Sequence, residues 1–171
     1  MNTKTLATVA LLIAMSFVGA HLVIMGTVAF DSLPGFLAAL LLGPVYGAAI
    51  GFLGHILTAT LRGFPFSVPL HIVVALSMAL TMYVFGVTFR ILSKKLSESV
   101  TFISTGVVGV IFNFPVSLAF SAATLWLIDG REAALGLVTL LAVPLLMASV
   151  ANIAIGIALF KVLRNVWNKN Q

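Results

Sequence analysis

The sequence contains no cysteine, so it forms no disulfide bond, holds no metal through thiolates and offers no thiol nucleophile. It also contains little charge: charged residues make up 8% of its 171 residues, whereas a soluble domain has about 25%. Hydrophobic residues make up 61% of the chain. Long apolar runs in such a composition are typical of helices that cross a lipid bilayer. The sequence therefore predicts an integral membrane protein.

Carboxylates are scarce as well, which argues against an enzyme and against an ion-coupled carrier. The four acids are Asp31, Glu98, Asp129 and Glu132, and none falls inside a predicted membrane-spanning segment. A hard metal needs clustered carboxylates, and an ion-coupled carrier is expected to bury an acid in the membrane. The chain also has no H-E-x-x-H zinc motif and no G-x-x-x-x-G-K-[ST] phosphate loop. We expect no catalytic residue, no cofactor and no metal site.

Apolar segments separated by turn or charge signals predict an all-α integral membrane protein with six transmembrane helices in a single domain, residues 1–171. Each crossing needs about 20 apolar residues, which leaves no room for a separate soluble domain. We interpret the first segment as a helix, although Lys4 and the apolar run behind it imitate a secretory signal. The predicted helices cover residues 5–26, 33–43, 45–61, 69–93, 101–128 and 134–163.

The predicted second helix, residues 33–43, is short. Its length is about 16 Å at 1.5 Å per residue, roughly half of the hydrocarbon thickness of a bilayer. It must therefore be tilted, shielded by neighbouring helices or extended into the preceding loop. Gly43 and Pro44 separate it from the next helix, because proline does not continue a helix from behind yet suits a helix start.

The basic residues predict the orientation of the chain in the membrane. With six helices, seven Lys and Arg residues fall on the side of the two termini, and only Arg62 and Arg131 fall on the other. Cytoplasmic loops carry an excess of Lys and Arg, so both termini are predicted to be cytoplasmic, an N-in and C-in topology. The net charge of +5 then reflects topology and contact with anionic lipid, and nucleic-acid binding is a poor interpretation of it. We expect a multi-pass protein of the plasma membrane.

Four glycines, Gly43, Gly47, Gly51 and Gly54, recur at intervals of three or four residues, which predicts one helical stripe. Their spacing differs from the Gly-x-Gly-x-x-Gly of a dinucleotide loop. In lipid, small residues let helix backbones approach closely, and this approach is a main source of packing energy. The stripe thus indicates helix packing, as does the A-x-x-x-A pattern of residues 10–14 in the first helix.

Polar residues follow one side of the fifth predicted helix, from the middle of the membrane to its outer end. Asn113, Ser117, Ser121 and Thr124 recur there at intervals of three or four residues. An amide at this depth is costly unless it faces protein or a water-filled cavity. Further candidates for the same inward-facing pocket are His55, Arg62, His71, Trp126 and Asn152. The sequence therefore predicts an outward-opening, neutral binding pocket.

Each of these residues has a structural alternative. Serine and threonine in membrane helices often bond to the carbonyl four residues earlier. Asn113 and Asn152 could clamp two helices together instead of lining a ligand. His71 is also compatible with an ordinary interfacial residue, and Trp126 with the aromatic belt at the membrane surface. The sequence leaves these alternatives open.

The chain resembles an S component, the substrate-binding membrane subunit of an energy-coupling factor (ECF) vitamin transporter. The likeness covers nearly the whole chain and consists of six helices in this length, the pair Ala10 and Ala14, a short second helix running into residues 42–47, and both termini inside. It implies that Ala10 and Ala14 dock on a transmembrane coupling subunit and that two separate ATPases supply energy. It also implies a ligand on the outer side, among the last three helices and the connecting loops, one of which contains Asp31.

Residues 30–35, together with His71, Asn113 and Asn152, are similar to the branch of this family that handles α-ribazole, the benzimidazole nucleoside of cobalamin's lower ligand. A neutral nucleoside needs amides, hydroxyls and an imidazole for hydrogen bonds, and aromatic faces for stacking. Pantothenate, a carboxylated vitamin, would need a cation, for which Arg62 is the candidate. Riboflavin is a further alternative. Outside this class, the alternatives are a small stand-alone facilitator or channel and an assembly subunit without a ligand.

Overall fold

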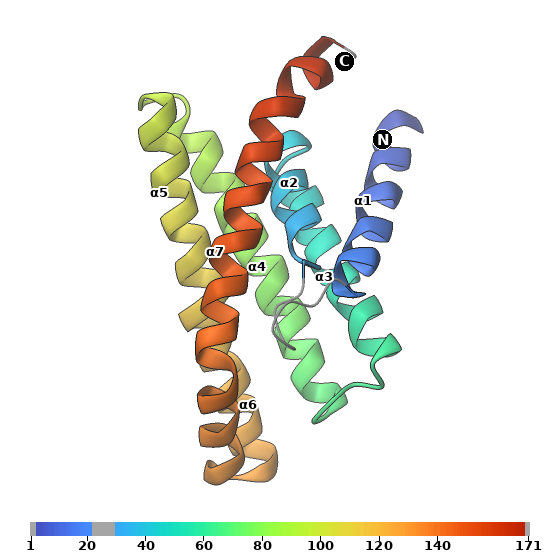
Figure 1. Cartoon of the computed structure of the whole chain (residues 1–171), viewed down its shortest axis with the longest axis vertical. Helices are drawn as coiled ribbons and strands as arrows, with labels where there is room; N and C mark the ends of the chain where they lie inside the picture. The colour runs from blue at the N-terminus through green and yellow to red at the C-terminus, as the bar shows by residue number, and fades with distance from the viewer. Residues whose placement is uncertain (1–2, 22–29, 170–171) are drawn as a thin grey trace.

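The computed structural model describes residues 3–21 and 30–169, and this part of the chain is helical throughout, without strands. The helices are α1 (Thr3–His21), α2 (Leu33–Leu41), α3 (Pro44–Leu61), α4 (Val68–Leu92), α5 (Glu98–Ile111), η1 (Phe112–Val116), α6 (Ser117–Asp129) and α7 (Arg131–Lys169) (Figure 1). Because α5, η1 and α6 run on without a break, six helices result in the described residues. The predicted all-α class is confirmed. The end of the predicted first helix, residues 22–26, lies outside the described part.

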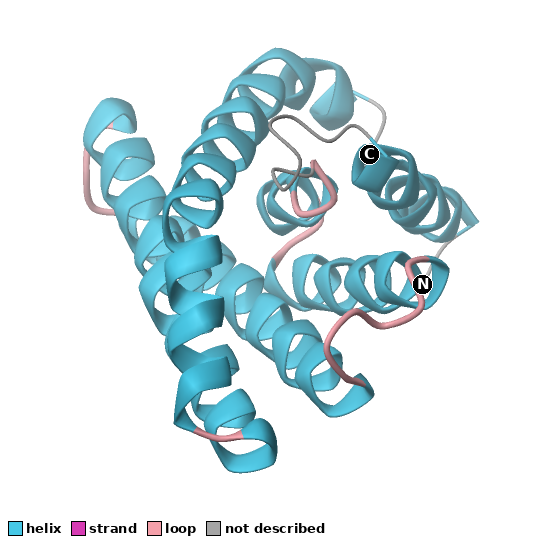
Figure 2. Ribbon diagram, turned by 60° about the horizontal axis from the view of Figure 1, so that its bottom comes forward, coloured by secondary structure: helices cyan, strands magenta, loops and turns pink. Residues whose placement is uncertain are grey.

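In the described residues five helices are long and apolar enough to cross a membrane, and α2 is not among them. Its nine residues are enclosed by α1, α3, α4 and α7, and all side chains from Pro34 to Leu40 are buried. Figure 2 shows this short helix inside a ring of longer ones. Of the three possibilities for a short helix in lipid, shielding by neighbours is therefore the one observed.

Glycines allow α3 to approach α2 and α4 closely. A Cβ on Gly47 would lie 2.6 Å from the Cβ of Ala39 on α2, and a Cβ on Gly51 would overlap the Sδ of Met82 on α4. The interpretation of these glycines as packing residues is confirmed. Gly43, however, does not belong to the stripe: it precedes the helix with a φ of 116°, and its α-carbon faces the guanidinium of Arg90. That conformation, which favours glycine, makes the sharp turn between α2 and α3.

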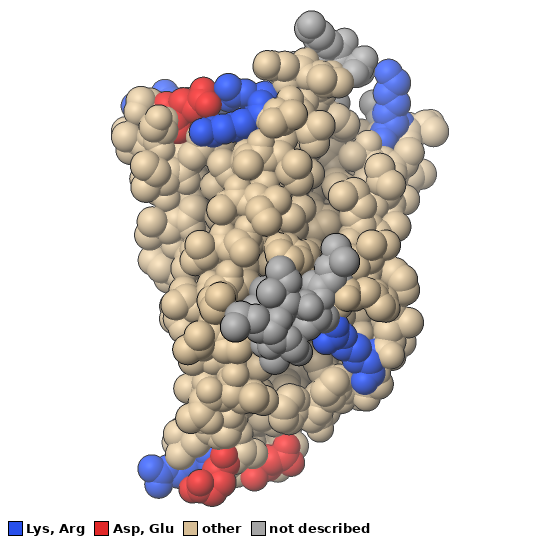
Figure 3. Space-filling model, in the orientation of Figure 1, with Lys and Arg blue, Asp and Glu red and all other residues tan. Residues whose placement is uncertain are grey.

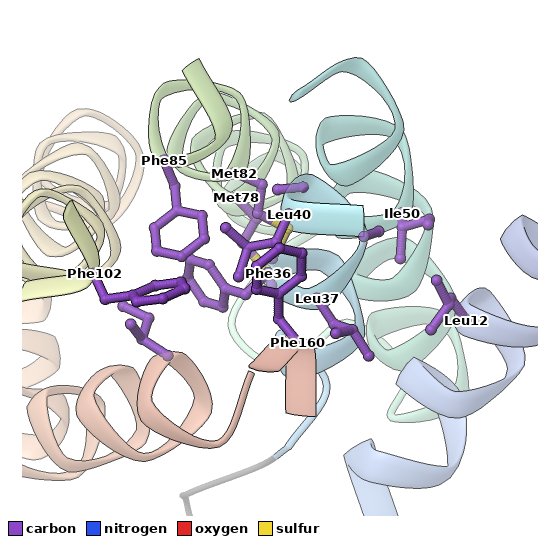
Figure 4. Packing of buried hydrophobic residues seen from close by; sticks show 13 residues of the cluster. Leu12, Phe36, Leu37, Leu40, Ile50, Met78, Met82, Phe85, Phe102 and Phe160 are labelled. Atoms are coloured by element: carbon purple, nitrogen blue, oxygen red, sulfur yellow. The ribbon is translucent and has the colours of Figure 1, made fainter. Parts of the chain in front are cut away.

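The main hydrophobic core surrounds α2. Phe36 of α2 meets Phe85 of α4 edge to face, with ring centroids 5.0 Å apart. Met82, Ile50 and Phe36 are fully or almost fully buried in the same cluster (Figure 4). Since a buried helix has no lipid-facing side, an apolar α2 that packs on all sides is the arrangement that its sequence favours.

The fifth predicted helix contains a π-helical turn that its sequence pattern did not predict. Proline at position 115 has no N–H to donate to the carbonyl of Ile111, and its ring crowds that carbonyl. The chain accommodates it with η1, in which the N–H of Ser117 bonds to the carbonyl of Phe112, five residues earlier. The predicted range 101–128 thus becomes 98–129, and the predicted last helix, 134–163, extends over Arg131–Lys169.

Most charged side chains on the face shown in Figure 3 gather at the two ends of the bundle, and the broad band between them is uncharged apart from one basic side chain. α1 begins and α7 ends at the same end of the molecule (Figure 1). We call this the inner end, following the predicted topology, and the junction of α6 and α7 marks the outer end. At the inner end Arg164 forms an ion pair with Glu98 at 3.2 Å. The band is the expected lipid-facing surface.

Candidate functional site

Three titratable side chains from distant parts of the sequence meet toward the outer end. Asp31 precedes α2, His55 lies on α3, and His71 lies near the start of α4. The Nε2 of His55 is 3.1 Å from the Nδ1 of His71, and the Nδ1 of His55 is 3.9 Å from a carboxylate oxygen of Asp31. The Nε2 of His71 lies 2.9 Å from the carbonyl oxygen of Pro65. We call Asp31, His55 and His71 the histidine cluster.

The Pro65 carbonyl fixes the direction of the hydrogen bonds in this cluster. A carbonyl only accepts, so the Nε2 of His71 carries the hydrogen and donates it. A neutral His71 then accepts at Nδ1, and the Nε2 of His55 donates to it. A neutral His55 is left with a bare Nδ1 that faces the carboxylate of Asp31. This Nδ1 is buried and has no hydrogen-bond partner among the described residues. With both imidazoles neutral, the cluster therefore ends in two acceptors, the Nδ1 of His55 and the carboxylate of Asp31, with no donor between them.

The loop between α3 and α4 supplies the other contacts of His71. Phe64 and Phe66 have positive φ angles of 51° and 70°, a region that costs a residue with a side chain about 1–3 kcal/mol. This conformation brings the ring of Phe64 edge-on to His71, with centroids 5.8 Å apart, while His55 stacks on His71 at 5.3 Å. Sequence reasoning missed Phe64 and Pro65, although a loop of this composition directly before a histidine-bearing helix is a usable signal.

The C-terminal end of α1 is attached to the cluster from the other side. Arg62 donates a hydrogen bond to the carbonyl oxygen of Ala20 at 2.5 Å, and the N–H of Phe30 donates to the carbonyl of Gly19 at 3.0 Å. Gly19 leaves no space for a Cβ against the Phe30 carbonyl. The predicted site residue Arg62 is exposed, and its guanidinium is bonded to the end of α1.

A second group of polar residues lies between η1 and α7. The amide of Asn113 donates to the Oγ of Ser149 at 2.9 Å, and the Oγ of Ser149 donates to the carbonyl of Leu145. The amide of Asn152 donates to the carbonyl of Ala148 at 2.8 Å. All three side chains are buried. Asn113 is therefore arranged as a link between two helices, which is one of the two roles that the sequence left open.

The stripe on the fifth predicted helix is longer than predicted. Thr101, Thr105, Gly109, Asn113, Ser117, Ser121 and Leu125 recur every fourth residue, and all are buried. The Oγ of Ser121 donates to the carbonyl of Ser117, and Thr124 bonds in the same way to Phe120. These hydroxyls thus satisfy themselves within their own helix. Trp126 is 64% exposed at the outer end, on the surface of the bundle.

The structure divides the predicted pocket residues between these two groups. Near the outer end, the space between α4, α6 and α7 is filled by a small apolar cluster, Leu70, Leu125, Ala134 and Leu137. The hydrogen bonds from the Asn113 and Asn152 amides to Ser149 and Ala148 lie on η1 and α7, whereas the bond between His55 and His71 joins α3 to α4. The convergence of all polar residues on one pocket stays a prediction.

Two apolar grooves lie elsewhere on the molecule. One, of about 630 Å³, runs between α5 and α7, and the other, of about 530 Å³, lies between α1 and the start of α2. The second groove includes Ala14 in its lining. Among residues 3–21 and 30–169, no three His, Asp or Glu side chains are grouped as metal ligands. The histidine cluster, in which the buried Nδ1 of His55 faces the carboxylate of Asp31 without a hydrogen-bond partner among the described residues, is the candidate site for a polar ligand contact.

Comparison with known protein families identifies the family of this chain. The model of a family described as "ECF transporter, substrate-specific component" matches residues 4–164, nearly the entire chain. No curated protein and no solved structure matches it.

Proposed function

This chain belongs to the family of substrate-specific components of ECF transporters, and from that premise we propose that it captures a neutral, nucleoside-like vitamin precursor at its outer end. Members of this family are transporter subunits and not enzymes. They bind small-molecule substrates and work with a membrane coupling subunit and ATPases. The chain is accordingly a multi-pass membrane protein, and we place it in the plasma membrane. α-Ribazole is our first candidate for its substrate.

The observation that carries the substrate class is the acceptor pair of the histidine cluster. The bare Nδ1 of His55 and the carboxylate of Asp31 are 3.9 Å apart, and both side chains are mostly buried. A buried acceptor without a donor costs about 1–3 kcal/mol. Ligand hydroxyls would remove this cost, and carboxylates accept hydrogen bonds from ribose hydroxyls in other nucleotide sites. The pair therefore suits the sugar of a nucleoside.

The surroundings of the pair favour a neutral ligand over an anionic one. Asp31 places a negative charge at the site, which repels a carboxylated vitamin such as pantothenate. Arg62, the candidate cation for such a vitamin, already donates to the carbonyl of Ala20. The stacked imidazoles of His55 and His71, with the ring of Phe64 beside them, provide aromatic faces for a heterocyclic base.

The second polar group is assigned a supporting role in this proposal. Asn113, Ser117, Ser121, Trp126 and Asn152 remain candidate ligand residues on α6, α7 and the turn η1. Binding through Asn113 requires that its amide exchange the bond to Ser149 for one to the ligand. Such an exchange keeps the number of hydrogen bonds donated by the Asn113 amide constant, and Ser149 still donates to the carbonyl of Leu145.

The exposed face of α1, the side that points away from the rest of the bundle, supports the proposed contact with the coupling subunit. Ala10 and Ala14 are both exposed, and Ala14 lines the apolar groove at the start of α2. Only four of the described residues of α1 are buried, Leu12, Ser16, Gly19 and Ala20, and they lie on the opposite side of the helix. A smooth, small-residue surface of this kind permits close approach of another membrane helix.

Isothermal titration of the purified protein with α-ribazole, riboflavin and pantothenate tests the proposal. Asp31→Asn and His55→Phe should each weaken α-ribazole binding about 10- to 150-fold, the equivalent of about 1.5–3 kcal/mol for a hydrogen bond involving a charged or buried group. Asp129→Asn and His21→Phe are the matched controls, because both residues are exposed and lie outside the cluster. They should leave the affinity unchanged.

Preferred binding of pantothenate that Arg62→Ala removes would overturn the neutral-ligand proposal. Equal affinities of the wild type and Asp31→Asn for α-ribazole would remove Asp31 from the site. Flux through liposomes that contain the chain alone, without any ATPase, would identify a facilitator instead.

A further inference from the structure

The groove between α5 and α7 is an unassigned feature at the inner half of the molecule. Figure 1 shows the two helices side by side, and the groove is lined almost entirely by apolar side chains, with Gly106 on α5. A Cβ on Gly106 would have its nearest neighbour, the Cδ1 of Ile157, at 3.7 Å. The glycine therefore keeps the groove open without being required for close packing of the two helices.

The dimensions of the groove match one membrane leaflet. It extends from Phe102 to Ile111 along α5 and from Val150 to Lys161 along α7, which corresponds to about 14–17 Å at 1.5 Å per residue. Half of the hydrocarbon thickness of a bilayer is about 15 Å. The groove thus begins at the inner charged end and stops near the middle of the membrane, the depth that one acyl chain reaches.

A cation marks the inner end of the groove. The ammonium of Lys161 lies 4.6 Å from the centre of the Phe102 ring, and Phe102 is itself held by stacking on Phe89 and by edge contact with Phe160. Glu98, the acid at this end, pairs with Arg164. Among the described residues no carboxylate forms an ion pair with Lys161. The groove therefore presents a positive charge at headgroup level and an apolar channel below it.

From this arrangement we propose that the groove is a binding site for an anionic glycerophospholipid of the inner leaflet. One acyl chain lies along Gly106 between α5 and α7, and the headgroup phosphate pairs with Lys161. The charge complementarity at one end and the leaflet-length apolar channel select a lipid over a soluble ligand. This site lies on a different face from the histidine cluster and does not depend on the identity of the transported substrate.

Native mass spectrometry of the purified chain with phosphatidylglycerol and phosphatidylcholine of the same acyl composition tests the site. The wild type should retain phosphatidylglycerol preferentially. Lys161→Gln should reduce this preference about fivefold, as expected for one basic residue near a membrane surface, about 1 kcal/mol. Lys4→Gln is the matched control: it removes the same charge at the same end, on α1, which makes no contact with α7 among the residues that the structure describes. It should leave the preference unchanged.

A second pair of variants tests the apolar part of the groove. Gly106→Leu should fill the groove and lower retention of both lipids, whereas Gly106→Ala, whose Cβ fits, should retain them. A thermal unfolding curve for each variant shows that it is folded. Equal retention of the two lipids by the wild type, or no effect of Lys161→Gln, would reduce the groove to ordinary lipid contact and overturn the proposal. Loss of assembly with the coupling subunit, with lipid retention unchanged, would assign the groove to a protein partner instead.

Discussion

Replacing Gly47 by alanine tests whether α2 is held by close backbone contact. The new Cβ would lie 2.6 Å from the Cβ of Ala39, 2.9 Å from its Cα and 3.0 Å from its N, whereas carbon atoms pack at about 3.5–4.0 Å. Two of these atoms belong to the backbone of α2. Because α2 contacts four other helices, it cannot move away from α3 without losing contacts elsewhere. We therefore expect overpacking.

The size of the effect follows from comparison with Gly136→Ala. Gly136 lies on α7 with no neighbour within 4 Å of an added Cβ, so alanine there only gains about 0.5–1 kcal/mol of helix propensity. The same gain applies at Gly47, and the difference between the two variants isolates the overpacking cost of about 1–3 kcal/mol. For a chain of this size that cost corresponds to a difference in Tm of about 2–12 °C.

Thermal unfolding followed by tryptophan fluorescence, in one detergent and at one protein concentration, measures this difference. Gly51→Ala should fall between the two variants, because the opposing atom is the Sδ of Met82, on a side chain that has several rotamers. A Tm of Gly47→Ala equal to or above that of Gly136→Ala would refute the reasoning. It would mean that α2 and α3 are not in backbone contact and that the glycines serve another purpose.

Two further predictions concern the polar group on α7 and the exposed face of α1. Asn113→Leu should lower the free energy of unfolding by about 0.5–1.5 kcal/mol, because it removes the bond to Ser149. A selective fall in α-ribazole affinity, measured by titration, would instead place this amide on the ligand. Ala10→Trp and Ala14→Trp should abolish vitamin uptake and leave binding by the isolated chain intact, while Leu127→Trp, at an 88% exposed position, should preserve both. Lost binding in a folded Ala10→Trp protein would contradict that separation.

The helices were predictable because each one carries its own signal. Apolar length and turn residues predict α3 and α4 to within one residue at either end. The short α2 was predicted from its apolar run and from the break at Gly43 and Pro44, but its position inside the bundle was not. Shielding, tilt and extension into the loop all satisfy the backbone in lipid, and the choice depends on how four other helices pack. A local pattern does not contain that information.

The histidine cluster illustrates the part that sequence does not encode locally. His55 and His71 were both candidates, yet their hydrogen bond joins two helices across a loop whose positive φ angles no composition rule predicts. Asp31 entered only through resemblance to a family. The polar stripe was found from Asn113 outward, whereas its inner half, Thr101 and Thr105, was overlooked because single threonines in apolar helices carry little signal.

Helix α1 connects the proposed substrate site with the proposed coupling-subunit contact, because one of its faces packs against the bundle near that site and the other is exposed. Its exposed face carries Ala10 and Ala14, and its buried face ends in two hydrogen bonds, from Arg62 to Ala20 and from Phe30 to Gly19. Two such bonds contribute about 1–3 kcal/mol in total. α2, in contrast, is enclosed on all sides and held by glycine contacts. In the part of the chain that the structure describes, α1 packs on α2 and α3 only, and because Phe30 is bonded to it, a displacement of α1 would act on the segment that carries Asp31.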